Sequence, residues 1–298
     1  MGKAIARSFS GVVTVRRHGK RELRTTLERL GLKPNKRLGQ NFLVDPALLD
    51  VIPGDADVKP GDRVFEIGPG MGGLTRRLLV QGAQVMAVEI DKGLAGFLRD
   101  TFASELSSGE FHLVEGDALA PEEKFHAAVE GWWAAGPQPR VVANLPYSIS
   151  GPLLGRLASR PCGQSLLLLQ KEVARKAVAG VGEEGYGPLA IRLSFRFRAK
   201  LGRSVPADVF WPKPNVDSSF LHLLPLPNVE ESEDALFRLV LGDAFGQRRK
   251  RLLPRFDKSY PEVASRMRAL GISDNARPET IPPAVWWEAV KGVPSPFA

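Results

Sequence analysis

Apolar runs of four to seven residues alternate with helix-like stretches from Gly61 onward, and this alternation limits the fold more than any other feature of the chain. The runs are rich in aliphatic and β-branched residues and occupy 63–67, 84–90, 111–114, 140–143 and 165–169. They are continuously apolar, as expected of strands that helices cover on both faces. Strands that alternate with helices predict a parallel sheet. We therefore expect an α/β fold with a parallel sheet and helices on both of its faces.

The segments between and after these runs complete the expected domain. Helices are expected over 74–80 and over 94–102, the second with Asp91 as its N-cap. Two further strands, at 190–198 and 216–224, are expected to pair antiparallel at the edge of the sheet.

Beyond residue 227 the chain changes in composition. A helix is expected over 235–245, and a basic cluster follows it, formed by Arg248, Arg249, Lys250, Arg251, Arg255 and Lys258. We therefore divide the chain into a basic N-terminal arm (1–35), a main domain (36–227) and a small helical domain with a basic face (228–298).

The N-terminal arm accounts for the charge imbalance of the chain. Residues 1–39 hold eleven Lys or Arg against Glu22 and Glu28, a net charge of +9, whereas the whole chain carries +8. Such a segment favours a polyanionic partner, because phosphate contacts release counterions. A solvated tail and an organellar transit peptide are the alternatives. The second is disfavoured by the helix that 22–32 is expected to form in continuity with the fold.

Several kinds of protein are excluded by what the chain lacks. It has no run of eighteen apolar residues, so no membrane span is expected. Its single cysteine, Cys162, excludes a disulfide framework, and the four scattered histidines offer no metal-ligand spacing. Because Cys162 lies outside every motif, we expect an inert small residue there.

The first apolar run leads into a glycine loop, Glu66-Ile67-Gly68-Pro69-Gly70-Met71-Gly72-Gly73. Glycines there allow a tight turn and a close approach to a ligand, and the N-terminus of the following helix favours an anionic group. Dinucleotide-binding enzymes use a related loop, but Glu66 stands two residues before the first glycine, where it would repel a pyrophosphate. A ligand with a cationic ammonium or sulfonium and a carboxylate suits both features, which favours S-adenosylmethionine.

Two more acidic residues follow apolar runs. Glu89 comes 21 residues after Gly68, where this fold places the acid that binds ribose hydroxyls. Asp117 follows the third run and is placed to accept a hydrogen bond from an adenine amine. Because the carboxyl ends of parallel strands form the ligand-binding edge of an open sheet, we expect the three acids to line one nucleoside site.

The fourth run ends in Asn144-Leu145-Pro146-Tyr147, a sequence that suits a flipped-out base with an exocyclic amine. We assign the Asn144 side-chain oxygen and the Leu145 carbonyl as acceptors for the amine, with Pro146 restricting Leu145 to extended backbone. Tyr147 would stack on the base, and Phe210 would close on its other face. Direct transfer needs positioning more than a strong base, so the lack of a nearby His or Cys fits. The alternative is a strand followed by a proline turn, with Phe210 packing in a loop.

In this order the motifs resemble one family closely: the ribosomal RNA adenine N6-dimethyltransferases of the bacterial small-subunit type, the KsgA/RsmA family. The resemblance covers about residues 26–289. Besides the sites above, it rests on the stretches 36–43, 169–174, 186–187, 212–218 and 244–250.

The resemblance implies a Rossmann-like S-adenosylmethionine-dependent methyltransferase fold with a C-terminal helical domain. It also implies transfer of four methyl groups to N6 of two adjacent adenosines in the 3′-terminal hairpin of small-subunit (16S) ribosomal RNA. The family acts in the cytoplasm on a late pre-30S particle, and loss of its bacterial members gives resistance to kasugamycin. We expect neither a metal nor a membrane partner, and a monomer because no apolar interface stripe is visible.

The resemblance also implies which residues bind each substrate. Donor binding is implied for Gln40, Asn41, Leu43, Glu66, Gly68, Gly70, Glu89, Ile90, Asp117, Ala118 and Asn144. RNA binding is implied for Arg37, Lys213, Arg248, Arg249, Lys250 and Arg251.

The chain departs from the family pattern at two points. The family usually continues after Lys250 with Thr, Leu and Asn, whereas this chain continues to Pro254 through Arg-Leu-Leu, so we expect the helix after the basic cluster to break early. Leu38 stands where the family often has Phe. The arm before Arg24 has no counterpart in the family pattern.

Three alternative functions share parts of this pattern. Large-subunit adenine methyltransferases of macrolide resistance usually have Ile in place of Leu145 and lack this form of the Pro-Lys-Pro stretch. DNA adenine methyltransferases normally carry two prolines in the fourth-strand motif. A non-catalytic ribosome assembly factor or mitochondrial transcription factor would not need Glu66, Glu89, Asp117 and Asn144 together, so these residues favour catalysis.

Overall fold

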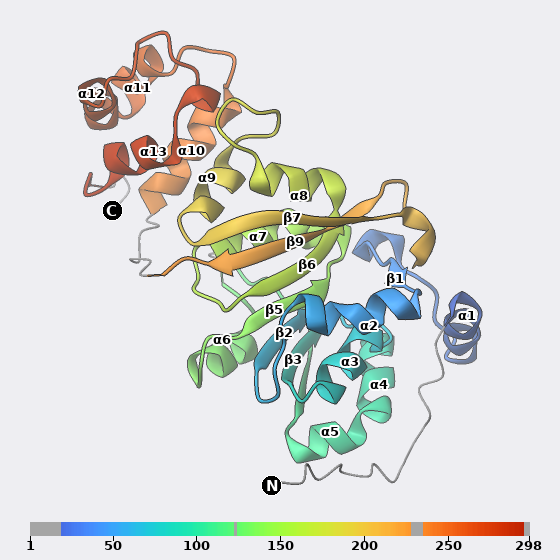
Figure 1. Ribbon diagram of the computed structural model, residues 1–298. Helices are drawn as coiled ribbons and strands as arrows, with labels where there is room; N and C mark the ends of the chain where they lie inside the picture. The colour runs from blue at the N-terminus through green and yellow to red at the C-terminus, as the bar shows by residue number, and fades with distance from the viewer. Residues whose placement is uncertain (1–18, 122–123, 228–234, 295–298) are drawn as a thin grey trace, which may run out of the picture.

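The computed structural model describes residues 19–121, 124–227 and 235–294, and a seven-stranded sheet forms its centre (Figure 1). The strand order is β4-β3-β2-β5-β6-β9-β7. Five strands are parallel: β2 (Arg63–Ile67), β3 (Gln84–Glu89), β4 (Phe111–Glu115), β5 (Arg140–Asn144) and β6 (Ser165–Gln170). The parallel α/β sheet predicted from the five apolar runs is therefore confirmed.

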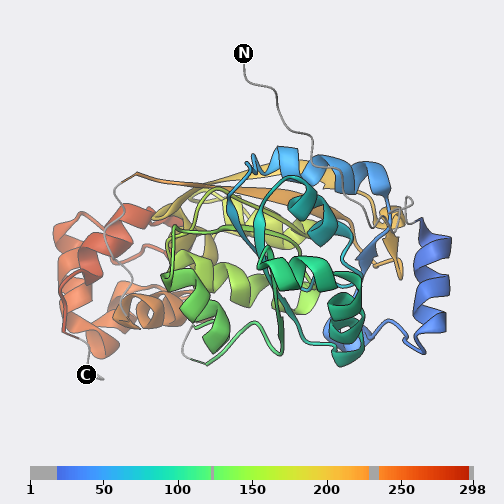
Figure 2. The ribbon, with the colours of Figure 1, turned by 90° about the horizontal axis from the view of Figure 1, so that it is seen from below.

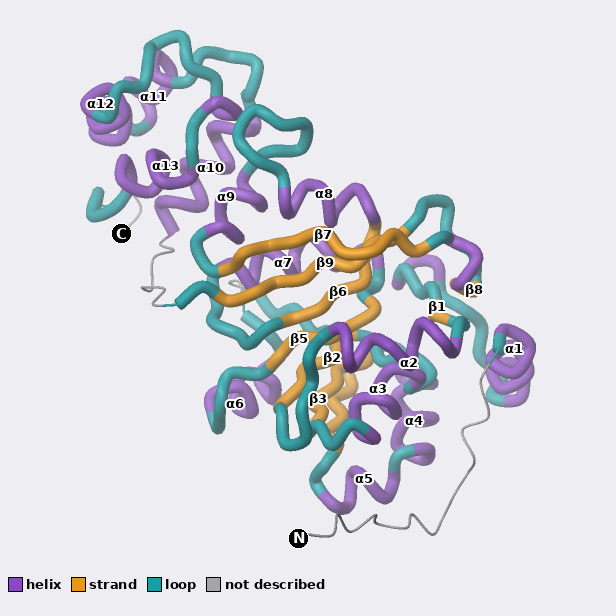
Figure 3. The backbone as a smooth tube through the Cα atoms, viewed as in Figure 1, coloured by secondary structure: helices purple, strands orange, loops and turns teal. Residues whose placement is uncertain are grey.

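Two antiparallel strands extend one edge of this sheet. Strand β9 (Ser218–Pro225) pairs with β6, and β7 (Phe197–Val205) pairs with β9 (Figure 3). The predicted strand at 216–224 is confirmed with a shift of one to two residues. The predicted strand at 190–198 is wrong, because most of it belongs to helix α9 (Pro188–Ser194).

The start of α9 explains this error. Pro188 lies in the first turn of the helix, where its fixed φ suits helical backbone and its missing N–H costs nothing. Ala190, Ile191 and Leu193 then bury their side chains between the sheet and the helical domain. The sequence alternates apolar and polar residues here, but tertiary packing on two sides selects the helix.

Helices cover both faces of the sheet. One hydrophobic cluster lies under α6 (Ala127–Ala134), α7 (Ser150–Ala158), α8 (Lys171–Val178) and α9, and a second lies under α2 (Pro46–Asp55), α3 (Gly73–Val80), α4 (Lys92–Thr101) and α5 (Ala103–Ser108). Neighbouring strand residues enter different clusters, as Val64 and Phe65 do. Two buried faces are the physical reason for the continuously apolar strands.

The helices around the glycine loop begin much as predicted. The α3 and α4 helices correspond to the expected 74–80 and 94–102, and the Asp91 side chain accepts hydrogen bonds from the Gly93 and Leu94 N–H groups as the N-cap of α4. Short elements join these layers: β1 (Phe42–Leu43), which pairs with β8 (Phe210–Trp211), and the 3-10 turns η1 (Lys36–Leu38), η2 (Tyr147–Ile149) and η3 (Ala207–Val209).

The helical domain has a hydrophobic cluster of its own. It contains α10 (Ala235–Gly246), α11 (Leu253–Ser259), α12 (Pro261–Ala269), η4 (Pro278–Thr280) and α13 (Pro283–Val290). Residues between Ala179 and Ile191, from the end of α8 through α9, pack into the same cluster. The predicted early break at Pro254 is wrong: this residue lies in the first turn of α11, where proline is tolerated.

Helix α1 (Lys20–Arg29) lies at the end of the molecule opposite the helical domain (Figure 2). Its buried Leu23 and Leu27 pack against Phe42, Val44 and Leu94. The predicted helix at 22–32 is thus confirmed, although it begins and ends two or three residues earlier. Residues 1–18 of the basic arm lie outside the described residues.

Candidate functional site

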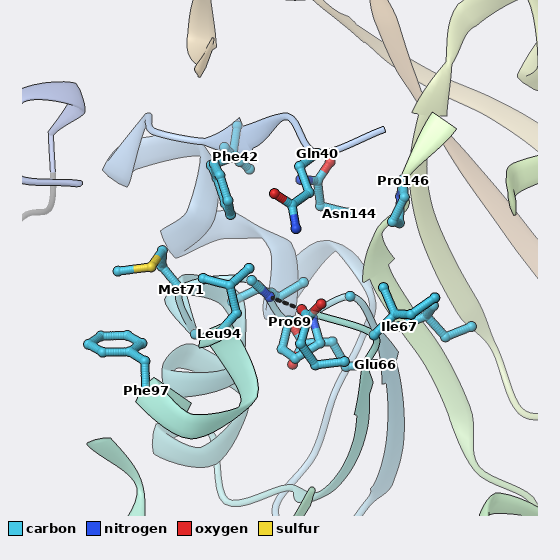
Figure 4. Close-up of a pocket in the computed structure, with 18 of the residues that line it drawn as sticks. Gln40, Phe42, Glu66, Ile67, Pro69, Met71, Leu94, Phe97, Asn144 and Pro146 are labelled. Atoms are coloured by element: carbon cyan, nitrogen blue, oxygen red, sulfur yellow. Dashed lines mark hydrogen bonds between the residues drawn. The ribbon is translucent and has the colours of Figure 1, made fainter. Parts of the chain in front are cut away.

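A cavity of about 590 Å³ opens at the carboxyl ends of β2, β3 and β5 (Figure 4). This is the edge at which open α/β sheets bind ligands, and the volume suits a small-molecule cofactor. Gln40, Asn144 and Pro146 lie on one side of the cavity, whereas Phe42, Met71, Leu94 and Phe97 form an apolar wall on the other.

The glycine loop after β2 forms the floor of the cavity. Gly68, Gly70 and Gly72 have φ values of 67°, 58° and 74°, in the left-handed region that glycine tolerates best. A Cβ on Gly68 would lie 3.1 Å from the Pro146 ring, so the two motifs are in direct contact. A Cβ on Gly72 would lie 2.5 Å from the Phe102 ring, which leaves no room for a side chain.

Glu66 is the most deeply buried acid of the site, with 2% of its surface exposed. Its Oε2 accepts a hydrogen bond of 2.7 Å from the Thr75 hydroxyl at the start of α3. Burial is the main cause that raises the pKa of the Glu66 carboxyl to about 8. The hydrogen bond from Thr75 lowers this pKa, and the nearby Glu89 raises it. The charged form is therefore disfavoured unless a cation binds beside it.

Glu89 ties the end of β3 to the glycine loop. Its Oε2 accepts from the Gly70 N–H and its Oε1 accepts from the Asp91 N–H, both at 3.0 Å. Burial raises the pKa of the Glu89 carboxyl, and these backbone donors oppose the rise. Asp117 also faces the cavity and accepts from the Leu119 N–H at 2.9 Å through Oδ1.

Asn144 joins the end of β5 to the N-terminal motif at 36–43. Its Nδ2 donates to the Asn41 carbonyl oxygen at 3.1 Å, a contact between residues 103 positions apart. This bond fixes which end of the amide is nitrogen, so Oδ1 is the end left to accept from a ligand. Gln40 holds the same segment in place: its Nε2 donates to Asp91 at 3.3 Å and its Oε1 accepts from the Asn35 N–H at 2.8 Å.

The other predicted target-base residues are Leu145, Tyr147 and Phe210, and their contacts lie outside the cavity lining. Leu145 has a buried side chain, and its N–H donates to the Leu168 carbonyl at 2.9 Å. The half-buried Tyr147 has its hydroxyl 2.8 Å from that of Ser218. Phe210 is 1% exposed, and its ring packs in the second cluster rather than in the cavity wall.

The structure brings the predicted donor-binding residues together. The following all line the cavity: Gln40, Asn41, Leu43, Glu66, Gly68, Gly70, Glu89, Ile90, Asp117, Ala118 and Asn144. Pro146 and Arg37 line it too, but Leu145, Tyr147 and Phe210 are not among its lining residues.

The other predicted RNA-binding residues lie away from the cavity. Lys213 is exposed in the loop before β9 and pairs with Asp208 at 2.5 Å. The exposed cluster Arg248, Arg249, Lys250 and Arg251 lies between α10 and α11 of the helical domain.

One wall of the cavity was not expected from the sequence. Helix α1 contributes Glu22, Leu23, Thr26 and Arg29 to the lining. The helical spacing of these residues is visible in the sequence, but nothing in it shows where the helix docks.

The side chains that other chemistries would need are inert or dispersed. Cys162 is 1% exposed, and burial raises the pKa of its thiol to about 12, so it is no nucleophile. Across the described ranges, His, Cys, Asp and Glu form no group of three that could hold a metal ion. No helix in these ranges combines the length and apolarity needed to cross a bilayer.

The sequence matches known proteins over most of its length. A sequence profile of the family "Ribosomal RNA adenine dimethylase" matches residues 31–293. A relative from Thermosynechococcus vestitus, ribosomal RNA small subunit methyltransferase A, is 39% identical over 268 residues, which cover 86% of this chain and 95% of the relative. A relative of the same name from Lactobacillus helveticus is 35% identical over 280 residues, covering 90% and 94%.

Solved structures match the fold. A dimethyladenosine transferase from Plasmodium falciparum has a TM-score of 0.63 at 24% identity and covers 83% of this chain and 94% of its own. The 23S rRNA methyltransferase ErmE has a TM-score of 0.59 at 24% identity and covers 84% and 98%. These similarities show the S-adenosylmethionine-dependent methyltransferase fold. The profile match and the two relatives establish that this chain belongs to the ribosomal RNA adenine dimethylase family.

Proposed function

We propose that this protein transfers methyl groups from S-adenosylmethionine to N6 of two adjacent adenosines in the 3′-terminal hairpin of small-subunit (16S) ribosomal RNA. The observation that carries the proposal is the orientation of the Asn144 amide, whose nitrogen is held by the Asn41 carbonyl and whose oxygen is left for a base amine. Asn144 lines the same cavity as the glycine loop. The family and the names of the relatives support the choice of RNA.

The chemistry of the cavity fits S-adenosylmethionine. The buried Glu66 carboxyl has no cationic partner among the described residues, and it would hold the ammonium group. Glu89 would bind the ribose hydroxyls and Asp117 the adenine amine, with Ile90 and Ala118 beside the adenine ring. When bound, this cofactor supplies an electrophilic methyl group on a positively charged sulfur, so no protein nucleophile is needed.

Three more residues complete the donor side. Gln40, Asn41 and Leu43 line the cavity across from the glycine loop, and hydrogen bonds from Asn35 and to Asp91 hold Gln40 in place. Gly68 and Gly70 allow the backbone to approach the donor closely. These residues bind and orient the donor, and we assign no proton transfer to them.

The target base is positioned by the fourth-strand motif. An adenine amine is a weak nucleophile because its lone pair is delocalised into the ring. The Asn144 oxygen and the Leu145 carbonyl would accept its two hydrogens and turn the lone pair toward the methyl group, a contribution of orientation. The ring of Tyr147 would stack on the base. Phe210 would meet the other face only after leaving the cluster that buries it.

The wider assignment follows the same family. We propose that residues 228–298 form an RNA-binding helical domain, that the arm (1–35) adds phosphate contacts, and that 36–227 is the methyltransferase domain. Phosphate contacts are assigned to Arg37, Lys213 and Arg248, Arg249, Lys250 and Arg251. We place the enzyme in the cytoplasm as a monomer acting on the pre-30S particle.

The test is to map the methylated positions. The purified protein is incubated with isotopically labelled S-adenosylmethionine and undermethylated small subunits, and the RNA is digested and analysed by mass spectrometry. We expect dimethyladenosine at two adjacent positions of the 3′-terminal hairpin. Large subunits and a catalytically impaired Asn144→Ala variant are the controls. Label in large-subunit RNA, or none in either subunit, would refute the proposal.

A further inference from the structure

We propose that helix α8 (Lys171–Val178) is a phosphate-binding surface that carries the RNA backbone from the target-base loop to the helical domain. This inference rests on the proposed RNA substrate and adds a surface to it. Neither Lys171 nor Arg175 is among the RNA contacts assigned above.

One end of α8 lies at the target-base loop. The Lys171 N–H donates to the Asp217 carbonyl at 3.0 Å, at the turn from β6 into the helix. The next residue, Ser218, has its hydroxyl 2.8 Å from that of Tyr147. A strand of RNA whose base stacks on Tyr147 therefore leaves the catalytic site beside the first turn of α8.

The other end of α8 leads to the helical domain (Figures 1 and 3). In the loop that follows, the Gly182 N–H donates to the Glu279 carbonyl at 2.9 Å, and the Tyr186 hydroxyl donates to the Ile281 carbonyl at 2.7 Å. The Tyr186 and Phe245 rings lie 6.2 Å apart, edge to face. Because Phe245 precedes Arg248 by three residues, this contact places the start of the basic cluster near the end of the α8 loop.

The two faces of α8 differ in character. Ala174 and Ala177 are buried under the sheet edge. On the outer side Lys176 pairs with Glu172 at 2.6 Å, but Lys171 and Arg175 have no acidic partner in the described part of the chain. These two cations are four residues apart and so lie on one side of the helix. Four residues of a helix rise about 6 Å, so these two cations form a short cationic path along the first half of α8.

Charge complementarity selects RNA as the occupant. The path has Arg248, Arg249, Lys250 and Arg251 near one end and Lys213, which pairs with Asp208, near the other, so cations continue from the catalytic edge to the helical domain. Lysine and arginine without acidic partners bind phosphates with release of counterions. An acidic protein surface is the competing partner, and the experiment separates the two.

The experiment compares two pairs of neutralised cations. Lys171→Gln/Arg175→Gln removes the path, whereas Arg198→Gln/Lys200→Gln removes two exposed cations of edge strand β7 that likewise have no acidic partner in the described ranges. The probe is an unmethylated transcript of the small-subunit 3′-terminal hairpin, free of protein. Its dissociation constant is measured at several salt concentrations.

The α8 pair should weaken RNA binding at least about tenfold near 0.1 M salt and lower the slope of log K against log salt by roughly 1.5, since each phosphate contact contributes about 0.7 to 0.9. The β7 pair should change affinity less than about twofold, because these two cations lie outside the proposed path and would contact no phosphate. Melting temperature and affinity for S-adenosylhomocysteine should stay unchanged. In the methylation assay KM for RNA should rise with kcat unchanged.

Equal losses in both pairs would show an effect of net charge alone and would overturn the proposal. An unchanged salt slope would also overturn it. Weaker binding to whole small subunits with normal binding to the transcript would assign α8 to a protein contact and refute the RNA path. Because the readout is binding to RNA, these outcomes are distinct from a wild-type protein that binds the transcript but methylates neither subunit, which would refute the proposed function instead.

Discussion

Replacing Glu66 with Gln tests how the site recognises the charge of its donor. Burial raises the pKa of Glu66 to about 8, so at pH 7 about ten carboxyls in eleven are neutral before the donor binds. An ammonium group beside Glu66 requires the charged form. Binding must therefore remove a proton, and the free energy of that step lowers the affinity below pH 8.

The size of this effect follows from the pKa. Deprotonation costs about tenfold in affinity at pH 7, or about 1.4 kcal/mol, and about a hundredfold at pH 6. S-adenosylhomocysteine is the suitable probe because it carries the ammonium and carboxylate without the sulfonium. Its dissociation constant should fall about tenfold between pH 6 and 7 and level off above pH 8. The Glu66→Gln variant should bind more weakly at pH 8 and show no such slope.

Isothermal titration calorimetry in two buffers of different ionisation enthalpy measures the proton directly. About 0.9 proton should be released per ligand at pH 7 by wild type, and almost none by Glu66→Gln. Glu89→Gln is the control, because burial also raises the pKa of Glu89; this variant should keep the slope, with its upper end at somewhat lower pH because the Glu89 charge helps to raise the pKa of Glu66. A flat profile in wild type, or a slope that survives Glu66→Gln, would refute the assignment of the ammonium to Glu66.

The same carboxyl predicts how stability depends on pH. Its pKa in the fold is raised from an ordinary value of 4.5, so the fold favours the neutral form. The stabilisation is fully present below pH 4.5 and is lost as pH rises through 8. Above pH 8 the donor-free Glu66→Gln variant should exceed wild type in free energy of unfolding, by on the order of 5 kcal/mol, as measured by urea denaturation.

Four other substitutions or deletions test the remaining assignments. Asn144→Ala should lower the single-turnover methylation rate by roughly a hundredfold or more with RNA affinity nearly unchanged; a parallel collapse of RNA binding would contradict the separation of pocket and basic surface. Tyr147→Ala should lose stacking on the base, about 1 to 3 kcal/mol seen as a higher KM for RNA, whereas Tyr147→Phe should keep it. Leu27→Asp places a charge at a side chain that is 2% exposed and should weaken S-adenosylhomocysteine binding by detaching α1, whereas the exposed Arg24→Asp should leave it unchanged; equal effects would exclude α1 as a wall of the site. Deleting residues 1–18, which hold four Lys or Arg, should lower the salt slope of RNA binding by up to about 3, and an unchanged slope would assign the arm to another partner.

The fold was predictable where local pattern and tertiary environment agree. The five parallel strands are continuously apolar because two layers of helices cover them, and that signal is present in the sequence itself. At 190–198 the apolar and polar residues alternate as in an edge strand, yet Pro188 and packing on two sides produce a helix. Pro254 does not break a helix, because proline disrupts only a helix interior and Pro254 lies in the first turn of α11.

The site was predictable where it follows from the topology of the sheet. Glu66, Glu89, Asp117 and Asn144 each come at a strand end, and parallel strands bring those ends to one edge. The outer wall made by α1 was not predictable, because amphipathic spacing shows that a helix buries one face but not against what. The burial of Phe210 likewise depends on pairing between β1 and β8, which are far apart in sequence.

The contact between Gly68 and Pro146 has a consequence for an enzyme that must act twice on one nitrogen. The spent donor has to leave and a fresh one has to enter between the two transfers. Since the Pro146 ring packs directly on the backbone of Gly68, a rigid ring against a fixed turn sets the spacing between the donor and acceptor subsites. The position of the target base relative to the donor site therefore stays the same while the cofactor is exchanged. The second methylation then starts from the same alignment as the first.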